Sequence, residues 1–137
     1  AFHHLVAIVV VDDDVAVLKR TGLVVGLGAR RGVCSSEVLS AVDRALQEAG
    51  RRREEIGILA SAWLKRDEPG MIEAARTLGR EMVFLPEQAL NSQCPSTASR
   101  AADLGLVGVA EPAVLALADR LILAKRAYGR VTVAIGE

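Results

Sequence analysis

The sequence has 137 residues, a length that predicts one domain with a core of its own. Lys and Arg together number 17, as do Asp and Glu, so the chain carries no net charge, which argues against attraction to nucleic acid or to an anionic membrane. Aromatic residues make up only 3% of the chain, so Ala, Val and Leu must build the core, and stacking platforms for single-stranded nucleic acid are not expected.

The cysteines and the apolar runs bear on localisation and on metal binding. Cys34 and Cys94 are isolated, with neither a CxxC pair nor a zinc-like spacing, which is typical of reduced thiols. No secretory signal is visible, and the longest apolar run, residues 5–11, is much shorter than a bilayer span. We therefore expect a cytoplasmic protein with no metal site, no cofactor and no membrane partner.

From residue 22 onward, the hydrophobic pattern alternates between strands and helices. Continuous apolar runs predict strands at residues 23–27, 56–62 and 82–85. Helical spacing and capping residues predict a helix from Ser35 or Ser36 to Gly50, a second from Pro69 to residue 78, a short turn at 86–90, and further helices at 98–104 and 112–119. The last two apolar runs, at 121–125 and 131–135, are close enough to pair as a hairpin.

This order predicts an α/β fold, a three-layer αβα sandwich. Its sheet is expected to be mixed and mainly parallel, with an antiparallel strand pair at the C-terminus. Residues 22–137 form the predicted domain, and residues 1–21 are interpreted as an N-terminal extension or an extra strand.

The stretch "GLGARRG" lies at the carboxyl end of the first predicted strand, the sheet edge where α/β proteins bind ligands. Gly26, Gly28 and Gly32 would let the backbone approach a ligand closely, and Arg30 and Arg31 would supply planar forks for a carboxylate or a phosphate. A tight turn with solvated arginines is the alternative. The third glycine of a dinucleotide fingerprint and the Walker lysine are both missing.

A second stretch, "LASAWLKRDEPG", would lie at the same edge if the two strands are parallel. It would bring a cation from Lys65, a flat apolar surface from Trp63, and the carboxylates of Asp67 and Glu68. The alternative, of equal weight, is that the charges form a surface ion-pair cluster and that Trp63 is a core residue.

Two further charged residues are candidates for the same site. Glu111, in "GVAEPAVLAL", either acts as an acid/base or polar anchor, or merely complements the dipole of a helix. Lys125, in "LILAKRAYG", is either a further site charge or an exposed lysine at the sheet edge.

Five motifs in sequence, "GLGARRGV", "LASAWLKRDEPGM", "FLPEQALN", "GVAEPAVL" and "LILAKRAYGRVTVAI", resemble the family of CobE and the C-terminal domain of CbiG in cobalamin biosynthesis. The resemblance runs from about residue 22 to the end. It implies a domain that binds corrin-ring intermediates, which carry acetate and propionate carboxylates around a flat apolar ring. It also implies, for CbiG-like proteins with their additional N-terminal domains, hydrolysis of a macrocycle lactone with loss of acetaldehyde.

Three functional hypotheses follow. The first is binding of a carboxylate-rich corrinoid intermediate. The second is a lactone hydrolase of the same pathway, with Glu111 or Lys65 as the acid/base. The third is a generic phosphate- or nucleotide-binding domain that uses the glycine loop. A corrinoid is the expected small-molecule partner, and other enzymes of the pathway and a second copy of the chain are further candidates.

Overall fold

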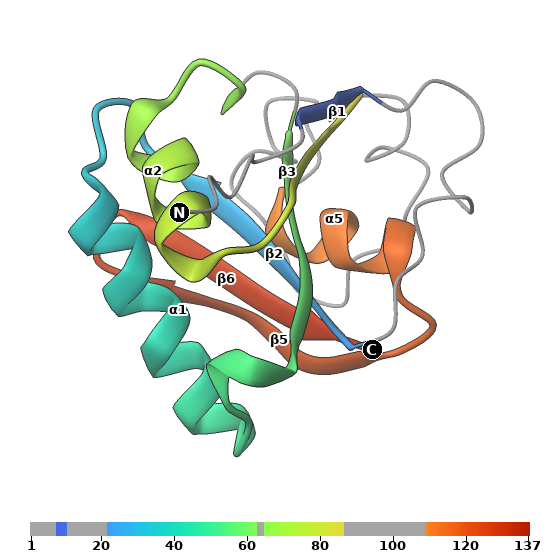
Figure 1. The fold of residues 1–137 in the computed structure, drawn as a ribbon. Helices are drawn as coiled ribbons and strands as arrows, with labels where there is room; N and C mark the ends of the chain where they lie inside the picture. Colours follow the sequence, from blue (N-terminus) through green and yellow to red (C-terminus); the bar gives the residue numbers. More distant parts are fainter. Residues whose placement is uncertain (1–7, 11–21, 63–64, 87–108) are drawn as a thin grey trace, which may run out of the picture.

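Six strands form one sheet in the computed structural model, which describes residues 8–10, 22–62, 65–86 and 109–137 (Figure 1). In chain order the strands are β1 Ile8–Val10, β2 Leu23–Ala29, β3 Ile56–Ala62, β4 Met82–Leu85, β5 Leu121–Tyr128 and β6 Val131–Gly136. Across the sheet their order is β1-β4-β3-β2-β6-β5. Strands β1, β4, β3 and β2 are parallel neighbours, and β6 is antiparallel to both β2 and β5.

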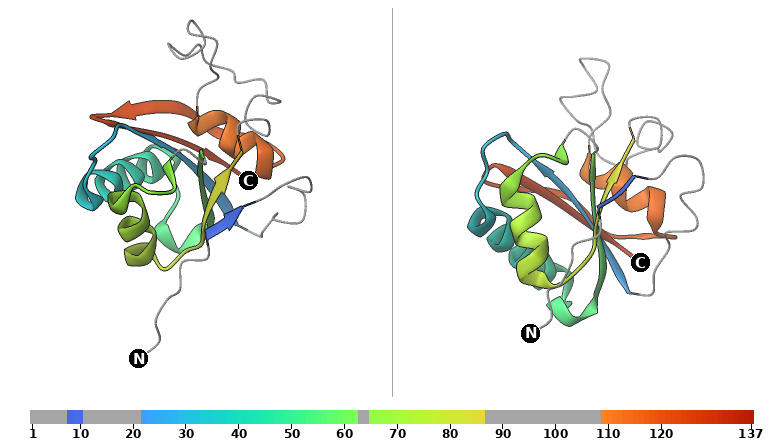
Figure 2. Two further views of the ribbon diagram at one scale, coloured as in Figure 1. Left: turned by 90° about the horizontal axis from the view of Figure 1, so that it is seen from above. Right: turned by 45° about the horizontal axis from the view of Figure 1, so that its top comes forward.

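Helices cover both faces of the sheet. α1, Ser35–Ala49, and α2, Pro69–Leu78, lie together on one face, and α5, Ala110–Leu117, lies on the other (Figures 1 and 2). A short 3-10 turn, η2 Arg53–Glu55, leads into β3. The predicted three-layer α/β sandwich with a C-terminal antiparallel pair is confirmed. None of the helices in the described ranges combines the length and apolar character needed to cross a bilayer.

Alternation along each strand divides the core into two layers. Val25, Leu27 and Leu59 face α1 and α2, whereas Val24 and Ile58 face α5. The polar side chain of Ser61 on β3 is fully buried, and its hydroxyl donates a 2.7 Å hydrogen bond to the Leu27 carbonyl of β2. That bond offsets the cost of removing the hydroxyl from water.

Contact between α5 and the sheet is close enough to involve backbone atoms. A Cβ atom placed on Gly26 would lie 2.1 Å from the carbonyl oxygen of Ala110, the first residue of α5. A Cβ atom on Gly136 would lie 2.3 Å from a methyl group of Val114 in the same helix. Glycines on two neighbouring strands thus allow α5 to lie directly on the sheet.

Several boundaries differ from the sequence prediction. β2 extends to Ala29 because it pairs with β6 as far as Ala29 opposite Val131, so the predicted end at residue 27 is wrong. β5 and β6 extend to Tyr128 and Gly136, and α5 runs from Ala110 to Leu117 instead of 112–119. The N-cap of α1 is Cys34, so neither Ser35 nor Ser36 caps the helix.

The remaining predicted elements either have the expected bounds or fall on residues that the structure does not describe. β3, β4 and α2 have the predicted bounds, and α1 ends before Gly50 as expected. Of residues 1–21, the structure describes β1, which lies beside β4. The expected turn at 86–90 lies outside the described residues except for Pro86. The expected helix at 98–104 lies outside them entirely.

The approach of α5 to β2 predicts a specific cost for Gly26→Ala. The added methyl group would overlap a backbone carbonyl that cannot rotate away, so we expect the free energy of unfolding to fall by about 1–3 kcal/mol. Urea denaturation measures this change.

Gly28→Ala is the matched comparison on the same strand. Its methyl group would meet the hydroxyl of Thr132 at 2.5 Å, a side chain that can rotate at a cost of about 0.5–1.5 kcal/mol. If Gly28→Ala is the more damaging of the two, the backbone contact with α5 is not what makes Gly26 necessary.

Candidate functional site

The turn after β2 presents two arginines at the carboxyl edge of the sheet. Residues 30–33 form a β-turn in which the Val33 amide donates a 3.3 Å hydrogen bond to the Arg30 carbonyl. Gly32 is the third residue of this turn and has a φ of +82°, the conformation that a type II turn requires at that position. The side chains of Arg30 and Arg31 are exposed. The Arg30 amide donates to the Arg130 carbonyl at 3.1 Å, which joins the turn to the end of the β5–β6 hairpin.

The loop after β3 reaches this turn through a carboxylate. The Gly32 amide donates a 3.2 Å hydrogen bond to Oε2 of Glu68. Glu68 closes a turn of its own, in which its amide donates to the Lys65 carbonyl at 3.0 Å. At the start of α2, a Cβ atom on Gly70 would lie 2.2 Å from the Val33 carbonyl, so the two loops also touch through their backbones. The loops predicted to share an edge therefore contact each other.

Gly26 and Gly28 lie elsewhere than in the predicted ligand loop. Both are internal residues of β2, and neither has a positive φ. The physical reason for glycine at these positions is packing, because added side chains would meet Ala110 at one and Thr132 at the other. Among the three glycines of "GLGARRG", Gly32 alone belongs to the turn, and its amide already binds Glu68.

Small side chains continue across the α5 side of the sheet at this edge. Gly28 pairs with Thr132 on β6, and Thr132 pairs with Ala127 on β5. Ala62, at the end of β3, belongs to the core layer on the same side. We call Ala127, Thr132, Gly28 and Ala62 the small-residue row. Ala127 is exposed and Thr132 half-buried, so part of the row reaches the surface.

Glu111 and Lys125 are brought together, although 14 residues separate them in the sequence. Glu111, the second residue of α5, is 1% exposed, and its Oε2 accepts a 2.8 Å hydrogen bond from the backbone amide of Lys125. The Lys125 side chain is half-buried. A carboxylate buried in this way acts on the backbone of β5, which neither sequence interpretation of Glu111 anticipated.

An ion pair at the same edge was not predicted from the sequence. Glu37, in the first turn of α1, binds Arg130 of the hairpin turn through two guanidinium nitrogens, one of them at 2.9 Å. Hydrogen bonding by Arg130 lowers the pKa of Glu37 from 4.5 to about 2, and the neighbouring thiol of Cys34, which donates to Glu37 at 3.3 Å, adds to the effect. Arg130 and Glu37 are 93 residues apart, so no local pattern could have indicated the pair.

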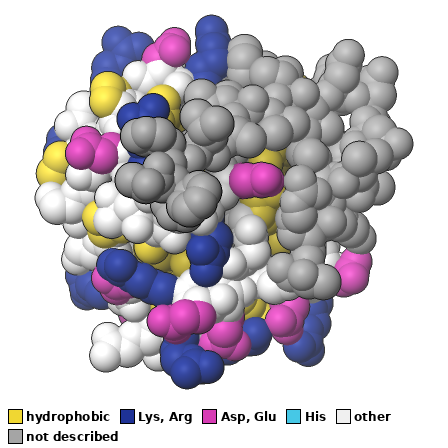
Figure 3. Space-filling model, in the orientation of Figure 1, with side chains coloured by type: hydrophobic (Ala, Val, Ile, Leu, Met, Phe, Trp, Pro, Cys, Tyr) yellow, Lys and Arg dark blue, Asp and Glu magenta, His cyan; other side chains and the backbone are white. Residues whose placement is uncertain are grey.

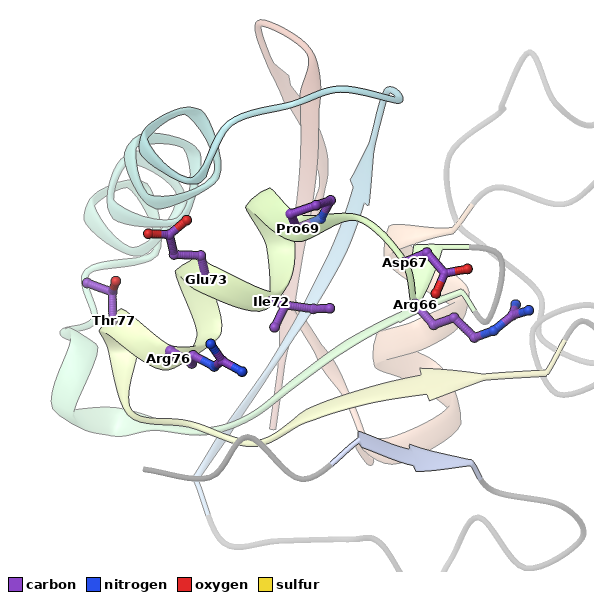
Figure 4. A pocket seen from close by; sticks show the side chains of 7 residues that line it. All are labelled: Arg66, Asp67, Pro69, Ile72, Glu73, Arg76 and Thr77. Atoms are coloured by element: carbon purple, nitrogen blue, oxygen red, sulfur yellow. The ribbon is translucent and has the colours of Figure 1, made fainter. Parts of the chain in front are cut away.

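The remaining candidates are more dispersed. Trp63 lies outside the described residues. Asp67 is exposed and, with Arg66, borders an open hollow of about 890 Å³ that runs along α2 past Pro69, Ile72 and Arg76 (Figure 4). Among the described residues, Asp67 is the predicted site residue that lines this hollow, and Arg30 and Arg31 do not line it. On the described part of the face in Figure 3, basic and acidic side chains are interspersed.

Comparison with known proteins gives the family. The model described as "Cobalamin synthesis G C-terminus" matches residues 23–136. This chain belongs to that family. Protein CobE of a Sinorhizobium species is 31% identical over 121 residues, which are 83% of this chain and 79% of that protein. A crystal structure of CobE, from the cobalamin biosynthetic pathway, has 35% identity and a TM-score of 0.72 and covers 82% of this chain and 87% of that one.

A longer family relative carries the name of an enzyme. The cobalt-precorrin-5A hydrolase of Priestia megaterium is 34% identical over 118 residues, which are 82% of this chain. The chain spans 31% of the length of that hydrolase. The expected resemblance to the CobE and CbiG C-terminal family is confirmed, and the chain is a cobalamin biosynthesis protein.

The contact between the two loops of this cobalamin biosynthesis domain predicts the effect of Glu68→Ala. Loss of the carboxylate frees the Gly32 amide, so we expect its hydrogen exchange to accelerate about 2- to 12-fold, equivalent to a hydrogen bond of 0.5–1.5 kcal/mol. Asp67→Ala, one residue earlier, is the control and should leave the exchange rate of Gly32 unchanged. Equal acceleration by both variants would contradict a specific role of Glu68.

The ion pair at the hairpin predicts a change of titration in Arg130→Ala. Without the guanidinium, the pKa of Glu37 should rise from about 2 toward 4.5, as measured by NMR titration of the side-chain carboxyl. Because the folded-state pKa is depressed, the pair stabilises the fold above pH 4.5, and this contribution disappears as the pH falls toward 2. The stability difference between wild type and Arg130→Ala should shrink over that range. Arg53→Ala, which breaks the separate pair with Asp43, should leave the pKa of Glu37 unmoved.

Proposed function

We propose that this domain binds a carboxylate-rich corrinoid intermediate at the carboxyl edge of its sheet. The observation that carries the proposal is the arrangement of cations there, two of them exposed arginines. Arg30 and Arg31 lie in the turn after β2, and that turn is hydrogen-bonded to the loop after β3, where Lys65 is found. A guanidinium binds a carboxylate with two parallel hydrogen bonds, the geometry suited to the acid side chains of a corrin ring.

The small-residue row supports the same ligand. Where the row reaches the surface, at Ala127 on β5 and the half-buried Thr132 on β6, its side chains are short and leave a surface without long projecting groups. A flat macrocycle with an apolar face fits such a surface better than a compact phosphate ester does. Membership of a cobalamin biosynthesis family adds that corrinoids are the compounds of this pathway.

The alternative hypotheses have less support. In a phosphate-binding loop, several free backbone amides converge on the anion. Here the Gly32 amide is bound to Glu68, and Gly26 and Gly28 lie within a strand. A hydrolase with Glu111 as its acid/base would need that carboxylate to reach the substrate, but it is 1% exposed and hydrogen-bonded to the β5 backbone. Because the chain is similar to part of a longer hydrolase, the test below also measures whether the corrin is hydrolysed.

The test is a titration of the purified chain with a polycarboxylic corrin, followed by absorbance, with the amidated corrin as a neutral comparison. We expect tighter binding of the carboxylic form. Arg30→Ala and Arg31→Ala should each weaken it about 10- to 100-fold, the equivalent of one charge-assisted contact of 1.5–3 kcal/mol. Mass spectrometry of the recovered corrin distinguishes binding, in which its mass is unchanged, from hydrolysis.

Arg76→Ala is the matched control, because Arg76 is an exposed arginine on α2 beside the separate hollow. It should leave the affinity unchanged, and thermal melts should show that all three variants are folded. If both turn variants bind as tightly as wild type, the proposed site is wrong. If Arg76→Ala alone weakens binding, the hollow along α2 is the site instead.

A further inference from the structure

An irregularity in β5 changes which side of the sheet Lys125 faces. Leu123 pairs with Ile135 and Arg126 pairs with Val133, so Ala124 and Lys125 together lie opposite the single residue Ala134. This arrangement is a β-bulge, in which one strand contributes one more residue than its partner. Ala134 belongs to the core layer under α5. The bulge therefore places Ala124 and Lys125 on the α5 side.

Residues on either side of the bulge show why it is needed. Leu123 and Tyr128 are both buried in the layer under α1 and α2, and Arg126 pairs with Glu48 of α1 at 3.2 Å. Simple alternation from Leu123 would put Lys125 on this same side and turn Tyr128 away from the core. The extra residue keeps Leu123 and Tyr128 in one core layer and transfers Lys125 to the other side, next to the small-residue row.

A bulge also leaves backbone groups without partners in the strand ladder. Glu111 supplies an acceptor here, because its buried Oε2 takes the Lys125 amide at 2.8 Å. Glu111 itself is fixed in position, since it is the second residue of α5 and the preceding Ala110 lies against Gly26. The position of α5 on the sheet therefore determines where the acceptor for the Lys125 amide lies.

We propose that Glu111 is a positioning residue that acts through Lys125, holding the β5 bulge so that the ammonium group of Lys125 can bind a carboxylate of the ligand. The inference rests on the proposed function, and it adds Lys125 to the ligand-binding residues while assigning Glu111 no contact with the ligand. Glu111 requires an acceptor oxygen for this role, whereas an acid/base would require an ionisable carboxyl.

The first measurement is independent of any ligand. Hydrogen exchange of the Lys125 amide should stay slow in Glu111→Gln, which retains an amide oxygen as acceptor, and accelerate at least about tenfold in Glu111→Ala. Exchange of amides in β3, which lies three strands away from β5 in the sheet, is the internal control for global unfolding. If the Lys125 amide is equally protected in Glu111→Ala, Glu111 does not hold the bulge and the inference is overturned.

The second measurement is a double-mutant cycle on polycarboxylic corrin affinity. Lys125→Ala and Glu111→Ala should each weaken binding about tenfold, Glu111→Gln less than about twofold, and Glu111→Ala should cost less than about twofold when added to Lys125→Ala. Additive losses would overturn the inference, as would a Glu111→Gln variant that loses affinity as strongly as Glu111→Ala.

The two proposals fail in different ways. A wild-type chain that binds no corrin rejects the proposed function, whereas the exchange experiment still tests the link from Glu111 to the bulge. A wild-type chain that binds, with affinity unchanged in Lys125→Ala, rejects the role of Lys125 and leaves the site at Arg30 and Arg31 standing.

Discussion

The contact of α5 with Gly26 is the constraint on which the α5 side of this domain depends. A backbone carbonyl lies where a side chain would otherwise project, so the start of the helix is located by backbone atoms rather than by adaptable side chains. Gly136, on the neighbouring strand, accepts Val114 and fixes the rotation of the same helix. Two glycine positions therefore determine where Glu111 enters the core and which strand its carboxylate can reach.

Three acidic side chains among the described residues bind groups of the protein itself. Glu68 binds the amide of Gly32, Glu37 binds the guanidinium of Arg130, and Glu111 binds the amide of Lys125. Together with the bond from the Arg30 amide to the Arg130 carbonyl, these contacts link the turn after β2, the loop after β3 and the β5–β6 hairpin into one frame. A site that needs preformed cation positions benefits from such a frame, because less side-chain and loop freedom is lost on binding.

Local patterns predicted the elements well and the long-range contacts poorly. The bounds of β3, β4 and α2 follow from continuous apolar runs, from Pro69 and from helical spacing, all of which act over a few residues. β2 was predicted too short because Gly28 resembles a strand ending, whereas pairing with β6 carries the strand past it. A glycine needed for packing and one needed for a turn look alike in sequence, so the pattern predicts Gly26 and Gly28 in a ligand loop. The β5 bulge and the pairing of Glu37 with Arg130 depend on residues that only the folded chain brings together.

The central place of β2 in the sheet has a consequence for the order of folding. On one side β2 pairs with β3, which follows it closely in the chain, and on the other it pairs with β6, whose residues 131–136 lie more than 100 positions later. The parallel half of the sheet with α1 and α2 can form from nearby segments, but one edge of β2 stays open until β6 arrives. An edge of β2 without β6 would present unpaired backbone groups, the kind of edge that promotes aggregation, so β6 protects the domain as well as completing its sheet.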